Sequence, residues 1–123
     1  MARCEEGYLC LVCGKDVEEI FESDLYLRYV MGWVDPETLH TTRECHIRCN
    51  PTLAQFIDDE RFQPPVVVEG PWSRDQLDPH FAEERTRLVT RGYARLWEIF
   101  NEEVRPDVID YPLIPFEKKR ETL

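Results

Sequence analysis

The chain has 123 residues, of which 42% are hydrophobic and 33% are charged, and this balance is that of a folded protein with a core of modest size. Its formal net charge of −10 argues against DNA or RNA as the main partner, because binding to phosphates needs a basic surface. No apolar run reaches the length of about 18 residues that a transmembrane helix needs, so we expect no membrane span.

The cysteine content indicates a reducing compartment. Five cysteines, an odd number, occur in a chain that begins MARCEEGYLC, which contains too little apolar sequence for a signal peptide. In reducing compartments cysteines bind metal ions more often than they form disulfides, so we expect a cytoplasmic protein. We also expect one domain over residues 1–123, divided into a zinc-binding module (1–62) and an extended connector, a long helix and a proline-rich tail (63–123).

The first motif is CLVCGK at residues 10–15. Two cysteines separated by two residues can bind one metal ion from a tight turn, and Gly14 allows the positive φ that such a turn often needs. Cys4, which precedes the motif, is expected to be a free thiol. Residues 16–22 fit either a short helix or extended structure, and we expect the extended form.

Residues 25–34 (LYLRYVMGWV) predict a strand. Large apolar side chains alternate along the segment, and its aromatic and β-branched content suits a pleated surface. Both faces are apolar, so we expect a central strand that ends at Asp35-Pro36. We interpret Tyr29 and Trp33 as core residues rather than as a stacking platform for a ligand.

The second motif is HIRC at residues 46–49. His46 and Cys49 are three positions apart, so in a helical turn they lie on one face and can complete a site that CxxC begins. Zinc prefers thiolate sulfur and imidazole nitrogen, arranged as a tetrahedron. We therefore predict a zinc (Zn²⁺) site with the ligands Cys10, Cys13, His46 and Cys49.

The choice of ligands stays open at one position. Cys45 and Cys49 have an i,i+4 spacing that could also chelate, whereas the gap between His46 and Cys49 mirrors that of CxxC. His40 is a further candidate from outside the motif. Three thiolates and one Zn²⁺ would leave one net negative charge, and we expect nearby cations to offset it. The cations that flank the motifs are Lys15, Arg43 and Arg48.

The CxxCGK and HxxC motifs, with a strand-like segment between them, resemble treble-clef zinc modules over residues of about 8–60. In that family a zinc knuckle supplies two ligands and the first turn of a following helix supplies the other two. Pro51 departs from the pattern, because a proline inside a helix loses a hydrogen bond and clashes with the preceding turn. We therefore expect a helix with Asn50 as N-cap and Pro51 as its first residue, running to about Asp59.

The second half of the chain predicts one dominant helix. Residues 64–72 are bounded by prolines and rich in valine, which indicates an edge strand or an extended connector. Residues 79–103 predict a long helix with Asp78 as N-cap, an apolar stripe, and close packing or a bend at Gly92. The stripe is long enough to pack on a second copy, which would make a homodimer. In the tail, residues 108–111 could add an edge strand and residues 112–116 could lie extended over the core.

Together these elements predict an α+β fold, with a small antiparallel sheet around a treble-clef-like zinc site, a short helix and one long C-terminal helix. A closed set of three thiolates and one histidine favours a structural zinc site in a protein-interaction module, and the acidic surface favours a basic partner. A thiol-redox or metal-sensing protein that uses CxxC is the alternative, although no helix pattern begins at the motif. A zinc-dependent enzyme would need a base such as Glu44, His40 or His80, and no HExxH motif is present.

Overall fold

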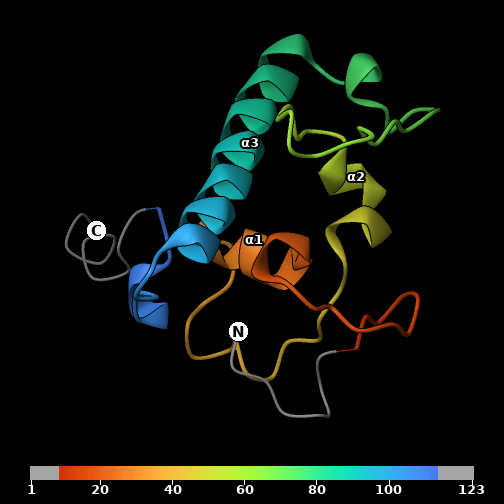
Figure 1. Cartoon of the computed structure of the whole chain (residues 1–123). Coiled ribbons are helices and arrows are strands. Elements are labelled where there is room, and N and C mark those ends of the chain that lie inside the picture. The colour runs from red at the N-terminus through yellow and green to blue at the C-terminus, as the bar shows by residue number, and fades with distance from the viewer. Residues whose placement is uncertain (1–8, 114–123) are drawn as a thin grey trace.

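The computed structural model describes residues 9–113, which form helices joined by long loops (Figure 1). The α-helices are α1 (Asp24–Val30), α2 (Pro51–Ala54) and α3 (Pro79–Asn101), and the 3₁₀ helices are η1 (Ile20–Glu22), η2 (Ile47–Cys49), η3 (Arg74–Gln76) and η4 (Val108–Asp110). The predicted α+β class is wrong for this range, because it contains no strand and no sheet. Its β-type pairing is limited to two isolated antiparallel bridges, Leu9 with Asp16 and Ser23 with His46.

Helix α1 replaces the predicted central strand. The side chain of Ser23 accepts a hydrogen bond from the backbone N–H of Tyr26 at 3.0 Å, which begins the helix as an N-cap does. Gly32, with a φ of +87°, ends it, and the N–H of Trp33 donates to the carbonyl of Arg28 at 2.9 Å. This is the Schellman arrangement, in which a glycine just beyond the helix adopts the left-handed conformation.

The strand prediction failed because α1 is apolar on nearly every side. Its buried residues include Leu25, Leu27, Tyr29 and Val30, which point in several directions around the helix axis. A helix that is buried all round shows no period of 3.6 residues, so apolar alternation cannot distinguish it from a central strand. The N-cap serine and the glycine after the helix were the local signals that could have distinguished the two.

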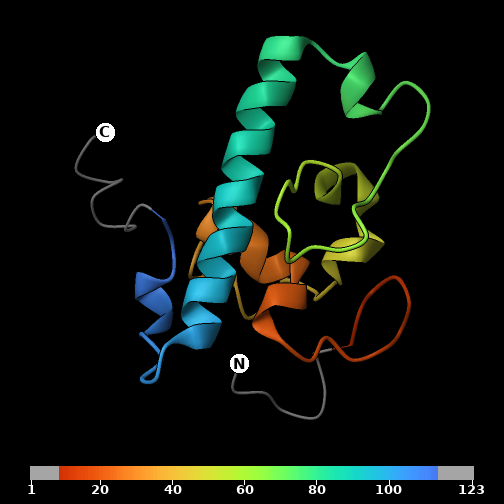
Figure 2. The same cartoon turned by 45° about the horizontal axis from the view of Figure 1, so that its top comes forward.

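Helix α3 confirms the predicted long helix. Asp78 caps it by accepting a hydrogen bond from the N–H of Phe81 at 3.0 Å, Pro79 is its first residue, and it ends at Asn101, two residues earlier than expected. It crosses α1 and η1 and packs against both (Figures 1 and 2). The residues that it buries against them and the rest of the core are Val89, Gly92, Tyr93, Leu96 and Ile99.

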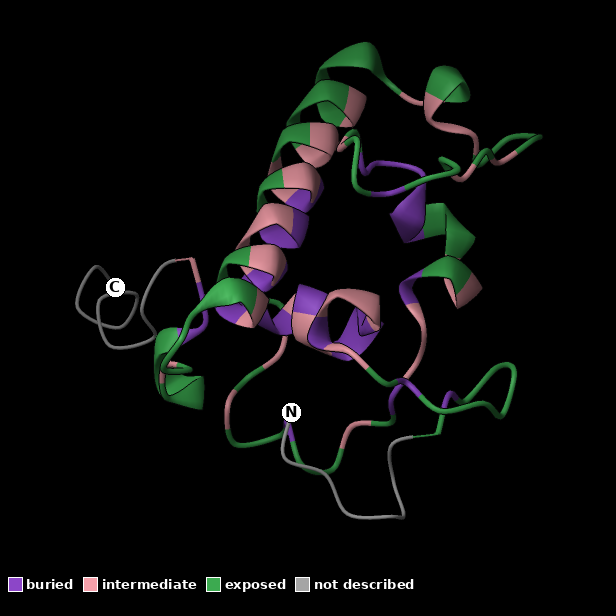
Figure 3. Cartoon of the chain, in the orientation of Figure 1, coloured by how far each residue is buried: buried purple, intermediate pink, exposed green. Residues whose placement is uncertain are grey.

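Close packing explains the glycine at position 92, and it is one of the two roles, close packing or a bend, that the sequence predicted there. A Cβ atom added there would lie 2.9 Å from Cγ of Met31 and 3.1 Å from Cδ1 of Leu27, so α1 approaches α3 at the glycine. The buried face of α3 is therefore covered by its own chain, while the first turns of the helix are largely exposed (Figure 3). Dimerisation through α3 stays a prediction.

Helix α2 begins as predicted but ends early. Asn50 precedes it and Pro51 is its first residue, yet it ends at Ala54 rather than near Asp59. The next residues continue as tight turns, because the N–H of Phe56 and that of Ile57 donate to carbonyls three residues back. Residues 63–70 then form a connector outside any regular element, with no strand pairing.

The tail packs on α1 as a 3₁₀ helix in place of the predicted edge strand. The hydroxyl of Tyr29 donates to the carbonyl of Val108 at 2.8 Å, and the N–H of Leu113 donates to the carbonyl of Val30 at 2.9 Å. Helix α1 is therefore enclosed by α3 on one side and the tail on another. The predictions for Cys4 and for the segment after residue 113 lie outside the described residues.

Candidate metal centre

The CxxC motif forms the tight turn that metal binding requires. The N–H of Gly14 donates to the carbonyl of Cys10 at 2.9 Å, and the N–H of Cys10 donates to the carbonyl of Lys15 at 2.8 Å. Gly14 has a φ of +78°, which confirms the expected left-handed conformation. The turn places Cys10 inside the molecule and Cys13 at the surface.

The HxxC motif is held between this turn and α1. The N–H of Leu11 donates to the carbonyl of Glu44 at 2.9 Å, and the N–H of Asp24 donates to the carbonyl of Cys45 at 2.8 Å. These two bonds fix the segment just before His46 on both sides. His46 then precedes η2, which ends at Cys49, so both predicted ligands lie in one turn before α2 rather than in its first turn.

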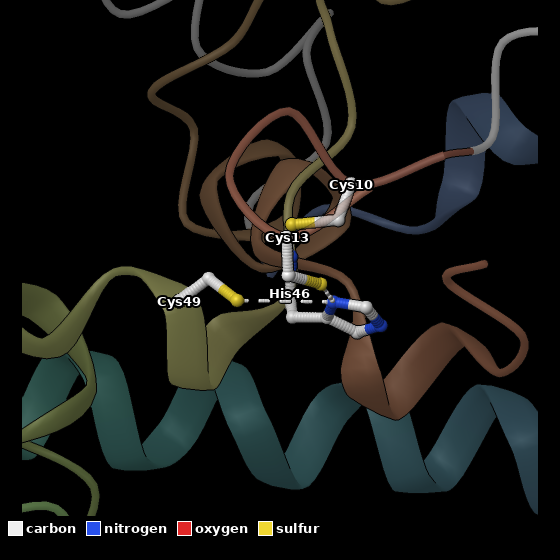
Figure 4. Close-up of side chains that lie close together, drawn as sticks. All are labelled: Cys10, Cys13, His46 and Cys49. Carbon is white, nitrogen blue, oxygen red and sulfur yellow. Dashed lines mark hydrogen bonds between the residues drawn. The ribbon is translucent and has the colours of Figure 1, made fainter. Parts of the chain in front are cut away.

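The structure brings together the four residues that the two motifs predict (Figure 4). Three Sγ atoms and one imidazole nitrogen, from Cys10, Cys13, His46 and Cys49, all lie within 4.8 Å of one another. Nδ1 of His46 lies 3.3 Å from Sγ of Cys13 and 3.9 Å from Sγ of Cys49. A tetrahedral zinc ion with ordinary bond lengths would separate such sulfur and nitrogen atoms by about 3.6 Å, so the donor set fits the ion.

The other nitrogen of His46 is already engaged. Nε2 lies 2.8 Å from the carbonyl oxygen of Asp16. A carbonyl oxygen only accepts hydrogen bonds, so Nε2 carries the proton, and in the neutral ring Nδ1 presents its lone pair to the three sulfur atoms. Metal-binding histidines are commonly oriented in this way by a bond from the second ring nitrogen.

The thiols differ in their ease of ionisation. Burial raises the pKa of the Cys10 thiol, but backbone N–H groups that point at its sulfur outweigh burial and lower the pKa to about 5. Two of these donors are the N–H of Val12 at 3.4 Å and that of His46 at 3.3 Å. Burial, with the neighbouring Cys10 and Cys13, raises the pKa of Cys49 to about 12. The protein alone thus stabilises the thiolate of Cys10, and a bound cation would stabilise that of Cys49.

Cys45 and His40, the alternative ligands, lie outside the four-residue group. The thiol of Cys45 faces the carbonyl oxygen of His46 at 3.3 Å, and burial raises its pKa to about 12. Arg48, one of the expected flanking cations, contacts no ligand sulfur; its Nη1 donates to the carbonyl of Pro64 at 2.7 Å. The groups imagined for an enzyme, Glu44, His40 and His80, form no shared cluster among residues 9–113.

Sequence patterns missed the polar network that holds this site on α1. Glu44 is only 2% exposed, and its Oε1 accepts hydrogen bonds from the hydroxyl of Ser23 at 2.8 Å and the N–H of Cys45 at 3.3 Å. Asp24 accepts a hydrogen bond from Asn50 at 3.1 Å. A buried glutamate two residues before a candidate ligand has no periodic signature, because its role depends on a contact across more than 20 residues.

Comparisons with family models, curated proteins and solved structures found no match to this chain. The treble-clef resemblance therefore stays a prediction, and the cluster of three cysteines and one histidine, with its fit to a metal ion, is what the structure supports. Among the helices of residues 9–113, none combines the length and the apolar character needed to cross a bilayer.

Proposed function

We propose that this chain is a zinc-binding protein in which the metal has a structural role, and that it acts as a protein-interaction module. The observation that carries the proposal is the convergence of three sulfur atoms on Nδ1 of His46 while Nε2 donates to Asp16. This arrangement selects the histidine tautomer that a metal needs. Zinc, when bound, would link the turn of the CxxC motif to the segment before α2, and so supply the connection that a sheet would otherwise provide.

The donor set favours a structural site over a catalytic one. Structural zinc sites have four protein ligands, commonly from cysteine and histidine, whereas catalytic sites keep three and leave a position for water. Here four donors lie together and none of them is a carboxylate. A closed tetrahedron leaves no position at which a substrate or a water molecule could be activated.

The environment of CxxC gives little support to a redox function. Redox-active pairs usually present an accessible thiolate at a helix N-terminus. Cys10 is 3% exposed, and the motif lies in a turn that precedes η1 by several residues. Its lowered pKa is therefore better suited to metal binding than to attack on an external disulfide.

Exposed apolar residues near the metal centre support the interaction role. Leu9, Leu11 and Val12 are 49%, 58% and 64% exposed, and they lie in or directly before the turn that carries the first two cysteines. Apolar side chains grouped on an exposed turn commonly mark a contact with another molecule. The net charge of −10 favours a partner with a basic surface.

The test is native mass spectrometry of the full chain purified without a chelator, with the metal identified and the accessible thiols counted. We expect one zinc per chain, with Cys4 and Cys45 as the two cysteines that do not bind it. Cys49→Ser should lose the metal, whereas Cys45→Ser, a matched change at the neighbouring thiol, should keep it. A metal-free chain with a Cys10–Cys13 disulfide would overturn the proposal.

A further inference from the structure

A cavity of about 380 Å³ lies beside the candidate metal centre. It is lined by residues of η1, η2, α3 and the turn at residues 61–62, and His46 and Cys49 belong to its wall. Its size is within the range of about 300–1,000 Å³ that small-molecule sites occupy. The cavity is therefore large enough for a bicyclic aromatic group.

Four aromatic residues in two contacting pairs belong to the wall. Phe21 stacks on Trp97, with ring centroids 4.1 Å apart and planes 10° from parallel. Phe62 meets Tyr93 edge to face, with centroids 5.3 Å apart. Such walls favour a flat apolar ligand, because aromatic rings gain from offset stacking and edge contacts beyond the area that they bury.

Two arginines in the wall differ in one respect that points to a ligand. Arg61 uses its Nε and Nη2 to hold both carboxylate oxygens of Asp59, at 2.9 and 2.8 Å. Arg48 is an exposed residue, and the Nε and Nη2 edge of its guanidinium has no acceptor among residues 9–113. Its Nη1 donates to the carbonyl of Pro64 at 2.7 Å, and its Cζ lies 4.1 Å from the ring centroid of Phe62.

The Nε and Nη2 edge of a guanidinium binds a carboxylate through two parallel hydrogen bonds, and a fixed guanidinium loses less freedom when it does so. We propose that this cavity binds an aromatic carboxylate, with the carboxylate on Arg48 and the ring against the aromatic side chains of the wall. The ligand chemistry is shared by free aromatic acids and by peptides that end in an aromatic residue. The inference goes beyond the proposed structural role of zinc and can fail separately from it.

The cavity wall also contains a carboxylate, that of Glu22. A positively charged aromatic ligand is therefore the competing possibility. Burial raises the pKa of Glu22, while the nearby His46 lowers it. A cationic aromatic ligand would need Glu22 as its partner. Arg48 is the better anchor, because its open edge is held in place by two contacts.

The experiment is a titration of the zinc-loaded full chain with 2-naphthoate, followed by ¹⁵N–¹H NMR. Two matched probes differ only in charge, the neutral 2-naphthalenemethanol and the cationic 2-naphthylmethylammonium. We expect saturable shifts at residues of the cavity wall, with the acid binding about fivefold or more tighter than the alcohol, as a charge-assisted bidentate contact would produce. The peptide acetyl-Gly-Gly-Phe, against its C-terminal amide, distinguishes a peptide source from a free acid.

Arg48→Gln separates the carboxylate contact from the aromatic wall. It should weaken acid binding to the level of the alcohol and leave alcohol binding unchanged, which also shows that the cavity is still formed. Arg87→Gln is the control, because Arg87 pairs with Glu84 on the exposed side of α3. Zinc content is measured for each variant.

Three results would overturn the inference. The first is an absence of saturable shifts at the cavity with both 2-naphthoate and acetyl-Gly-Gly-Phe. The second is tighter binding of 2-naphthylmethylammonium than of 2-naphthoate. The third is an equal affinity for 2-naphthoate in Arg48→Gln and in the parent chain. If any of them occurs in protein that carries one zinc, the cavity inference fails while the proposed function stands. If the protein carries no zinc, the proposed function fails whatever the titration shows.

Discussion

Residues 9–50 and helix α3 are held together by different kinds of contact. Helix α3 is 23 residues long, and its backbone hydrogen bonds join residues that are close in the sequence. In residues 9–50 the longest regular element is α1, with 7 residues, and much of the pairing crosses between loops, as when Leu11 donates to Glu44. Loops paired over such distances lose more chain entropy on folding than a helix does, so they need a further source of stability.

The location of the four candidate ligands indicates where that stability arises. All of them lie in residues 9–50 and none in α3. A metal bound by Cys10 and Cys13 from one turn and by His46 and Cys49 from another would close a loop of more than 30 residues. From this difference we expect α3 to depend on its apolar face for stability and residues 9–50 to depend on zinc.

Removal of zinc should have the largest effect on stability. Structural zinc contributes on the order of 10 kcal/mol to the folding of zinc-finger peptides, so we expect excess chelator to lower the free energy of unfolding by about 3 kcal/mol or more. Urea unfolding with and without chelator measures the change. Cys49→Ser should be less stable than the parent chain even without chelator, and chelator should not lower its free energy of unfolding further. Equal stability of the parent chain in both conditions would show that residues 9–50 fold without metal.

Leu96→Ala should have the next largest effect, and it tests the other region. Leu96 is fully buried on α3, and truncation of a buried leucine costs about 2–5 kcal/mol through lost burial and the cavity left behind. Thermal and urea unfolding measure the loss, and zinc stoichiometry should stay at one per chain. Leu11→Ala, at a leucine that is 58% exposed, is the matched control and should change stability by less than about 1 kcal/mol.

Gly92→Val should destabilise the contact between the two regions. The added side chain would meet Met31 and Leu27 of the α1 segment, and overpacking of this kind costs about 1–3 kcal/mol. Gly92→Ala should cost less, because better helix propensity offsets part of the clash and the Met31 side chain can move. A valine variant as stable as the parent chain would show that α1 does not approach α3 at this residue.

Asp78→Ala should have the smallest of these effects. Loss of the hydrogen bond from the N–H of Phe81 to the Asp78 carboxylate should cost about 1 kcal/mol. Asp107→Ala is a matched control, since Asp107 precedes η4 in the same way but its side chain makes no capping hydrogen bond. Urea unfolding of both variants makes the comparison, and an equal loss of stability would contradict the assigned cap.

The same contrast explains which predictions from sequence succeeded. Helix α3 was predicted to within two residues at its end, because Asp78, Pro79 and the apolar stripe are local signals. The four candidate ligands could also be identified, since the spacing in CxxC and HxxC is set by the chemistry of the metal rather than by the surrounding fold. The structure brings these four residues together as the motifs predicted.

Periodicity alone could not show that the predicted sheet was wrong. Residues 25–34 alternate as a strand does, and the tertiary contacts that make them helical come from α3 and from the tail more than 70 residues away. Only Ser23 and Gly32 carried local information against a strand. Glu44 is another such case, because its burial against Ser23 depends on how the ligand segment docks on α1.

X-ray absorption spectroscopy at the zinc edge of the purified full chain tests the central claim most directly. The account predicts a four-coordinate ion with three sulfur atoms at about 2.3 Å and one nitrogen at about 2.0 Å. Cys45→Ser should leave this spectrum unchanged. A first shell that contains oxygen, or four sulfur atoms with Cys45 in place of His46, would contradict the proposed closed site.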